Sequence, residues 1–331
     1  MATYKGIQGF TIQNLSADPS NPIEGQVWYN STSNVWKVEE ATTVGAWATG
    51  NSMGTARYLH GGNGTQTAAL AVGGLNPPTI GTTEKYDGTS WTATGPLNTA
   101  RAYHSSEGTQ TAAVAFGGDS PVIPGTTGAT EDFNGTSWTN SNPLNTIRLS
   151  LAGAGTQTAA LAFFGRDTVN LTSTEEYDGT NWTSVNSGNT ARRYLGGCGL
   201  QTAALAVGGT APPATVINQT ELYDGTSWTT SPASMNTARY QMGVVGTQTL
   251  ALAFGGSTST PGGGTPAVAE TELWDGTSWT STTSLNTARR NLAGAGTQSS
   301  AVAFGGGGTA VGTTEDWTGA GAAVTKTITV S

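Results

Sequence analysis

Six arginines recur along the chain, and they are the charged residues whose number and spacing could do chemistry. Each ends a four-residue phrase of the NTAR type: Arg57, Arg101, Arg148, Arg192, Arg239 and Arg289. Each is followed by a glutamate in a TExY-type phrase: Glu84, Glu131, Glu175, Glu221, Glu272 and Glu315. Guanidinium groups that converged would form an anion site. The alternative is a set of structural contacts from arginine to glutamate or to backbone carbonyl groups.

The other reactive side chains are turn aspartates, two histidines and one cysteine. YDGTSWT and its variants begin at residues 86, 133, 177, 223 and 274, and their Asp or Asn suits a turn better than a catalytic site needed only once. His60 and His104 each lie three residues after a repeat arginine, where the other units carry Leu or Met, which indicates a packing position. Cys198 alone forms neither an internal disulfide nor a thiolate metal cage. We predict no catalytic residue, no metal site and no cofactor.

The elements that position these residues come from a repeat. GTQTAALAVGG and its variants begin at residues 64, 108, 155, 199, 246 and 296, so the units are 44 to 50 residues long. Each unit predicts four strands: one running from the arginine, one formed by TAALAV with both faces buried, one by TEKY, and one that begins at a Trp. Asp-Gly between the last two would supply the positive φ angles of a tight hairpin.

Composition excludes several classes of protein. The chain has 48 glycines and few of the Leu, Glu, Lys and Arg runs that long helices need, so we expect an all-β protein. Its net charge of −8, with only 13 Lys and Arg, argues against nucleic acid and membrane surfaces as partners. The opening residues contain no signal-like or membrane-spanning apolar run. We expect a soluble protein made in the cytoplasm.

The order of Gly-Gly after the second strand, Tyr in the third and Trp in the fourth resembles the kelch repeat, over residues 42 to 317. The resemblance implies a six-bladed kelch-like β-propeller. Its Trp anchors would be Trp47, Trp91, Trp138, Trp182, Trp228 and Trp279, beside the six arginines. Trp47 stands ten residues before Arg57, as Trp91 does before Arg101, so the Trp47 segment would complete the last blade. The strand-like residues 323–330 are the alternative.

Variation within the repeat predicts a contact surface. The loops after the second strands differ between units, while the turns at the opposite end are nearly constant, so recognition would reside on one face. Our candidate contact residues are Asn76, Asp119, Arg166, Asp167, Asn218 and Thr260. These loops carry no aromatic residue, which counts against a deep sugar-binding platform and favours a protein neighbour or a shallow glycan contact.

The N-terminal phrase NPIEGQVWYNSTSNVWKV predicts a short hairpin, and it is similar to segments of structural proteins of tailed bacteriophages. The repeated phrases also resemble phage structural proteins, especially from phages of marine bacteria. The resemblance implies a non-enzymatic virion protein: a tail fibre, a tail-tip adhesin or a capsid decoration. It would attach to other virion proteins through residues 1–41, expose the propeller of residues 42–319 to a host-surface glycan or protein, and end in a strand or tail at 320–331. A homo-oligomer on the particle also fits.

Two other function classes stay open. One is a glycan-processing enzyme of the sialidase kind, although the sialidase Asp-box has one more residue between Asp and Gly than YDGTSW does. The other is a bacterial kelch-type scaffold that binds an intracellular protein, for which the N-terminal hairpin has no obvious use. The copper chemistry of kelch-fold galactose oxidases lacks its ligands here, because the chain has two histidines and one cysteine.

Overall fold

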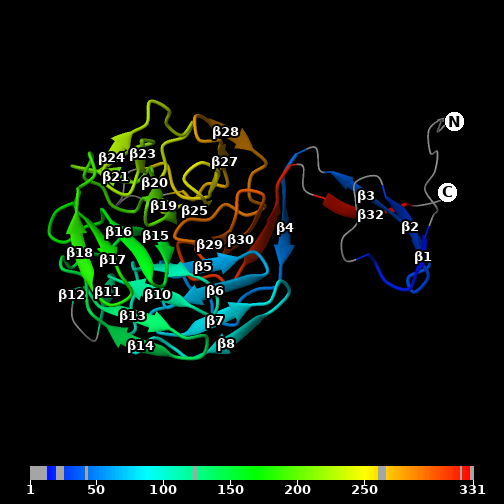
Figure 1. Cartoon of the computed structure of the whole chain (residues 1–331), viewed down its shortest axis with the longest axis horizontal. Coiled ribbons are helices and arrows are strands. Elements are labelled where there is room, and N and C mark those ends of the chain that lie inside the picture. Colours follow the sequence, from blue (N-terminus) through cyan, green and yellow to red (C-terminus); the bar gives the residue numbers. More distant parts are fainter. Residues whose placement is uncertain are drawn as a thin grey trace. The chain divides into compact units, whose positions relative to one another are not determined.

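The computed structural model describes residues 13–19, 26–41, 44–121, 125–259, 266–320 and 323–328. This part of the chain is all β and contains no helix (Figure 1). It divides into two compact units. The smaller unit comprises Met1–Gly45 and Gly319–Ser331, and the larger unit comprises Ala46–Thr318.

The larger unit consists of repeated four-stranded antiparallel sheets, as in a β-propeller-like fold (Figure 1). The first sheet contains β5 (Gly61–Thr65), β6 (Ala68–Val72), β7 (Thr83–Tyr86) and β8 (Trp91–Thr94). The second contains β9 (Ser105–Gly108), β10 (Ala113–Phe116), β13 (Thr130–Phe133) and β14 (Trp138–Ser141). The third contains β15 (Ala152–Thr156), β16 (Ala159–Phe163), β17 (Thr174–Tyr177) and β18 (Trp182–Val185).

Three further sheets follow the same order. The fourth contains β19 (Gly196–Leu200), β20 (Ala203–Val207), β23 (Thr220–Tyr223) and β24 (Trp228–Thr230). The fifth contains β25 (Gly243–Gly246), β26 (Ala251–Phe254), β27 (Thr271–Trp274) and β28 (Trp279–Thr282). The sixth contains β29 (Ala293–Gly296), β30 (Ser300–Phe304), β31 (Thr314–Thr318) and β4 (Ala46–Gly50). Two variable loops also form small hairpins: β11 (Asp119–Ser120) with β12 (Gly125–Thr126), and β21 (Thr210–Ala211) with β22 (Thr215–Val216).

The sixth sheet joins two distant parts of the sequence. Strand β4 pairs antiparallel with β31, and Trp47 stands opposite Trp317. Their rings lie 5.2 Å apart between centroids. The rival segment pairs elsewhere, because β32 (Ala323–Ile328) lies against β3 (Val35–Ala41) of the smaller unit. The ten-residue spacing from Trp47 to Arg57 therefore predicted the partner of β31.

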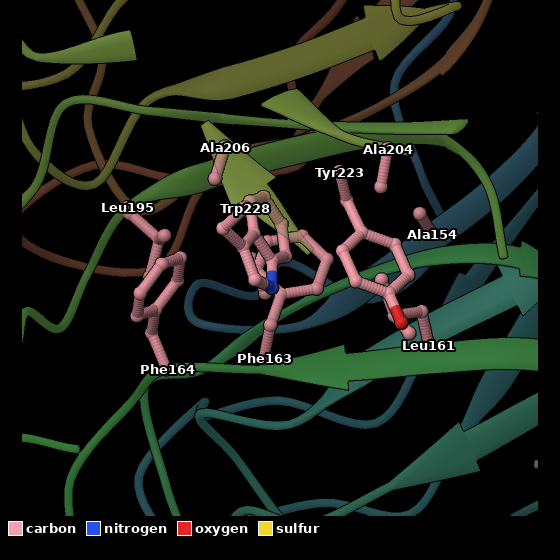
Figure 2. Packing of buried hydrophobic residues seen from close by; sticks show 10 residues of the cluster. Ala154, Leu161, Phe163, Phe164, Leu195, Ala204, Ala206, Tyr223 and Trp228 are labelled. Atoms are coloured by element: carbon pink, nitrogen blue, oxygen red, sulfur yellow. The ribbon is translucent and has the colours of Figure 1, made fainter. Parts of the chain in front are cut away.

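The core of the larger unit lies between neighbouring sheets. Second strands such as β16, with sequence AALAF, are buried because small residues let the sheets approach each other closely. Figure 2 shows one such contact, in which Phe163 of β16 meets Trp228 and Tyr223 of the following sheet. The ring centroids of Phe163 and Trp228 lie 5.0 Å apart, so the aromatic residues fill the space that the alanines leave.

The first strand of each sheet starts later than predicted. We expected it to run from the repeat arginine, but β15 begins at Ala152, four residues after Arg148, and the other five first strands show the same offset. The reason is Ser150, whose φ of +56° is incompatible with an extended strand. The equivalent residue of every unit has a similar angle, and the consequences of this bend appear at the candidate site.

The YDGTSW turn also differs in detail from the prediction. Gly88 has a positive φ of +90°, but Asp87 does not. Instead, the Asp87 carboxylate accepts hydrogen bonds from the backbone N–H groups of Thr89 and Ser90, at 2.8 and 2.7 Å. The aspartate is thus a local acceptor that fixes a four-residue connection between Tyr86 and Trp91.

The smaller unit contains one mixed sheet in the order β1 (Gln13–Leu15), β2 (Val27–Asn30), β3 and β32. The two strands predicted at the N-terminus are β2 and β3, an antiparallel pair. Asp18 accepts hydrogen bonds from buried Trp28, from Asn30 and from Lys37, and these bonds, that of Lys37 foremost, lower the pKa of Asp18 to about 2. The C-terminal segment 320–331, predicted as a strand or tail, contributes β32 to this sheet.

Candidate functional site

The six repeat arginines are buried inside the sheets and do not converge. Each is paired with the glutamate of its own unit, at 2.6 to 3.0 Å in the second, third, fifth and sixth units. Arg148 shows the pattern: one guanidinium nitrogen lies 2.6 Å from Glu175, and another donates to the carbonyl groups of Phe164 and Ser173. Burial lowers the pKa of Arg101 to about 10, and the charge of Glu131 opposes this shift. The terminal guanidinium nitrogens and the glutamates are thus engaged in structural contacts, whereas the Nε atoms of Arg101, Arg192, Arg239 and Arg289 have no partner.

The remaining residues of the NTxR phrase explain its repetition. The Glu175 carboxylate also accepts from the backbone N–H groups of Asn145 and Thr146, at 2.7 and 3.1 Å. The Asn145 amide donates to the carbonyl of Trp182, at 2.7 Å. The phrase therefore ties the link before a first strand to the third and fourth strands of the same sheet.

Two other repeated residues connect neighbouring sheets. Each fourth-strand Trp donates its indole N–H to a Thr of the preceding sheet, at 3.0 to 3.1 Å; the donors are Trp47, Trp91, Trp138, Trp182, Trp228 and Trp279. The Gln of each GTQT-type turn donates to two carbonyl groups of the preceding sheet. Gln157, for example, bonds to Ala113 and Phe133 at 3.2 and 2.8 Å. The sequence alone indicated no role for this Gln, because its partners lie in another unit.

The remaining candidate catalytic groups are buried and weakly reactive. His60 and His104 are 7% and 6% exposed, and burial is the main cause that lowers the pKa of both, to about 3 for His104. Both imidazoles are therefore neutral near neutral pH. Burial raises the pKa of the Cys198 thiol, which keeps it protonated. Among the described residues, no group of His, Cys, Asp and Glu could hold a metal ion.

A cavity of about 270 Å³ lies where the six first strands come together. Its wall is rich in glycine, and Glu107 is the one carboxylate among the described residues that line it. Ser105 donates a hydrogen bond to Glu107, at 3.0 Å, and Gly153 of the next sheet leaves room for this carboxyl group. Burial raises the pKa of Glu107 to about 8, so it is largely protonated at neutral pH. A single uncharged carboxyl group provides no pair of acids for catalysis.

The second residue after each repeat arginine belongs to a hydrogen-bonded ring. In each, the backbone N–H donates to the carbonyl of the equivalent residue in the preceding unit, at 2.8 to 2.9 Å, and the first residue donates to the last. All six have φ between +56° and +59°. We call them the ring residues: Leu59, Tyr103, Ser150, Tyr194, Gln241 and Asn291.

The ring lies at the same end of the sheets as the variable loops, and we call this end the loop face. Leu75, in the first variable loop, exchanges backbone hydrogen bonds with Tyr58, which directly precedes the ring residue Leu59. The ring side chains and the six residues that follow them line a second cavity, of about 110 Å³. Tyr194 has its ring centroid 6.1 Å from that of Tyr103 and 6.0 Å from that of Tyr240. Aromatic side chains thus reach the loop face from outside the loops.

The predicted contact residues are distributed around this ring. Asn76 and Arg166 are exposed, and Asp167 is half-buried beside Arg166. Asp119 and Arg166 pair through their backbones with Ala102 and Leu149, which directly precede ring residues. Asn218 has a structural contact, since its amide donates to the carbonyl of Met235 at 2.7 Å. Thr260 lies outside the described residues.

Sequence reasoning missed the ring because Leu and Tyr disfavour positive φ, so nothing in residue type marks these positions. Their place in the repeat does not mark them either. Aligning the units on the repeat arginine shows that the second residue after it differs in nearly every unit, but the residue directly before it differs as well: Tyr58, Ala102, Leu149, Arg193, Tyr240 and Arg290. The alignment alone therefore does not single out the ring residues; their shared φ angle and backbone hydrogen bonds do.

Comparison with known families and with curated protein sequences adds no relative. No model of a known protein family matches the chain, and no curated protein sequence matches it significantly. The described residues include no helix long and apolar enough to cross a membrane. The kelch and phage resemblances therefore rest on the sequence phrases that carry them.

Proposed function

We propose that the chain is a non-enzymatic structural protein of a tailed-bacteriophage virion, built around a closed six-bladed kelch-like β-propeller. It is made in the host cytoplasm and assembled into the particle. There it serves as a tail fibre, a tail-tip adhesin or a capsid decoration. The loop face is its contact surface, directed at the host surface or at other virion proteins.

Three sets of contacts support closure into six blades. The first strands contact one another in the order β5, β9, β15, β19, β25 and β29, and β29 contacts β5. The pairing of β4 with β31 joins the two ends of the larger unit within one sheet. The indole bond from Trp91 to Thr314 links the first sheet to the sixth. A closed ring of blades has few free strand edges, which suits a particle protein present in many copies.

The observation that carries the non-enzymatic assignment is the occupancy of the repeated polar groups. The repeat arginines, glutamates, tryptophans and glutamines have partners within the sheets or between them. A sialidase-like enzyme needs acids and arginines that converge on one substrate, whereas each of these arginines is held in a different sheet. Side-chain variety is concentrated at the loop face, which favours binding over catalysis.

The smaller unit supports an attachment role. Residues 1–41 contribute three strands to a sheet with its own buried tryptophan, Trp28, and β32 completes that sheet. We assign the contact with other virion proteins to residues 1–41. The partner at the loop face is a host-surface glycan or protein, and the chain can also form a homo-oligomer on the particle. Nucleic acid and membrane are not partners in this account.

Mass spectrometry of purified particles tests the virion assignment. Particles banded by density and washed at high salt should retain peptides of this chain at a constant ratio to the major capsid protein. Loss of the chain on washing, or its presence in uninfected bacteria, would instead favour the bacterial scaffold. Release of free sugar from host glycans by the purified chain would favour the sialidase-like enzyme.

A further inference from the structure

The ring residues occupy strained backbone without using glycine. A left-handed conformation strains a non-glycine residue, because its Cβ comes too close to the following carbonyl oxygen, yet none of the six ring residues is Gly in a chain with 48 glycines. The chain does use glycine at positive φ only a few residues away, as at Gly73 and Gly74. Leu and Tyr are among the residues least suited to this conformation. The side chains at the ring therefore have a role that glycine could not fill.

Those side chains give the 110 Å³ cavity an aromatic arc and unused hydrogen-bonding atoms. Tyr103 and Tyr194 flank Ser150 in ring order, and all three line the cavity. The Ser150 hydroxyl and the Asn291 Oδ1 have no hydrogen-bond partner, although the residues are only 5% and 8% exposed. The Asn291 amide nitrogen is already used, donating to the carbonyl of Gly307 at 3.2 Å. Buried polar atoms without partners are costly and call for an explanation.

The character of the cavity selects among ligands. Its lining consists of the ring residues together with His60, His104, Leu151, Leu195, Met242 and Leu292, and at neutral pH none of these described residues carries a charge. A charged ligand would find no counter-ion in this lining. Arg193, whose guanidinium lies against the Tyr194 ring, is not part of the lining. Its volume equals that of about four water molecules, which admits one edge of a small ring. Aromatic faces beside hydrogen-bonding groups suit a molecule with apolar C–H faces and hydroxyl groups.

We propose that this cavity binds a neutral saccharide unit, the terminal sugar of a glycan. The sugar's C–H face packs on Tyr194, one hydroxyl group donates to Asn291 Oδ1, and another exchanges a hydrogen bond with the Ser150 hydroxyl. The guanidinium of Arg193 lies 5.4 Å from the Tyr194 ring centroid and helps to hold that ring in place. This inference deepens the proposed function, because it names the chemistry of the loop face.

Saturation-transfer NMR on the full chain tests the proposal, with D-glucose, D-galactose and N-acetyl-D-glucosamine as probes, each free and as the terminal unit of a trisaccharide. We expect at least one of these sugars to receive saturation from the wild-type protein. Tyr194→Gly should weaken the apparent affinity at least about tenfold, because the aromatic face is lost. Tyr194→Phe, which keeps that face, should bind nearly as well as the wild type. A stronger signal from the trisaccharide identifies a glycan end rather than a free sugar as the source.

A loss of binding by Tyr194→Gly would not be due to misfolding, because glycine readily adopts the positive φ of a ring residue. The thermal unfolding of this variant should match the wild type or exceed it. The proposal is overturned if none of the probes receives saturation, or if Tyr194→Gly binds as well as the wild type. Sugar binding by a chain absent from particles would retain the cavity assignment and remove the virion role. If the chain is present in particles but binds no probe, the virion role is retained and the cavity assignment is removed.

Discussion

The side-chain contacts between sheets and the backbone bonds of the hydrogen-bonded ring both occur six times. In the first set the residue type is constant, and in the second only the backbone conformation is. Between sheets the bond uses a side-chain atom, so the residue itself recurs, as with Gln157 and Trp182. In the ring the bond uses only backbone atoms, so the conformation recurs while the residue varies among Leu, Tyr, Ser, Gln and Asn. Repetition of a residue therefore marks a structural role. Repetition of a conformation with different side chains marks positions where the fold constrains only the backbone, so that the side chains can serve binding.

The largest effect expected on the structural side is the loss of a buried charge pair. Arg148→Met would leave the Glu175 carboxylate buried without its guanidinium, and two backbone carbonyl groups without a donor. We expect the free energy of unfolding to fall by about 3–5 kcal/mol, measured by urea denaturation. Arg166→Met, at an exposed arginine of the loop face, is the matched control and should change stability by less than about 0.5 kcal/mol. Equal effects of the two changes would erase the distinction between repeated and variable arginines.

The histidine pair offers a test through acid. Because the folded-state pKa of His104 is lowered from 6.5 to about 3, the unfolded chain takes up a proton first as pH falls. The contribution of neutral His104 to the free energy of unfolding is fully present above the unfolded-state pKa and is lost progressively as the pH falls below it. His104→Leu places there the residue that three other units carry, as at Leu151. When the pH falls from about 7 to about 4, the free energy of unfolding of His104→Leu should fall by about 3 kcal/mol less than that of the wild type.

Parallel urea titrations of wild type and His104→Leu at several pH values measure this difference. His60→Leu serves as the companion variant, and the direction of its effect should be the same because burial lowers the pKa of His60 as well. Identical pH profiles for wild type and His104→Leu would show that the imidazole is not held neutral in the fold.

A smaller effect should come from the glutamine that bridges two sheets. Gln157→Ala removes two hydrogen bonds to carbonyl groups of the preceding sheet. We expect a loss of about 1–2 kcal/mol, read from chemical denaturation. Thr158→Ala, at the exposed neighbouring position, is the control and should be close to neutral. If both variants are neutral, the constancy of GTQT has another cause.

The smallest expected effect has the opposite sign. Tyr194→Gly relieves the strained backbone of a ring residue. It also raises the conformational entropy of the unfolded chain and removes the aromatic contacts with Tyr103 and Tyr240. The net change in the free energy of unfolding should lie between zero and a gain of about 1 kcal/mol, measured calorimetrically. A loss of several kcal/mol would mean that Tyr194 is a packing anchor like Trp182, and the contrast between ring and sheets would fail.

Particular residues show how far sequence carries in this protein. The four-stranded units and the partner of Trp47 followed from spacing, because each repeated phrase corresponds to one strand or turn. The role of Gln157 could not be predicted, since its partners lie in the preceding unit. The bend at Tyr103 and Tyr194 could not be predicted either, because bonds between units impose a conformation that these residues disfavour alone. The pairing of β32 with β3 depends on the far end of the chain, which no spacing rule connects to it.

The most direct test of the account is thermal unfolding of wild type, Gln157→Ala and Tyr194→Gly, each with and without the three sugar probes. One scan reports stability and binding together, because a ligand that binds the folded state raises its midpoint. We predict that Gln157→Ala unfolds at a lower temperature but keeps the sugar-induced rise, while Tyr194→Gly keeps its midpoint and loses that rise. A Tyr194→Gly protein that is destabilised yet still responds to sugar would contradict the division between residues that hold the fold and residues that make contact.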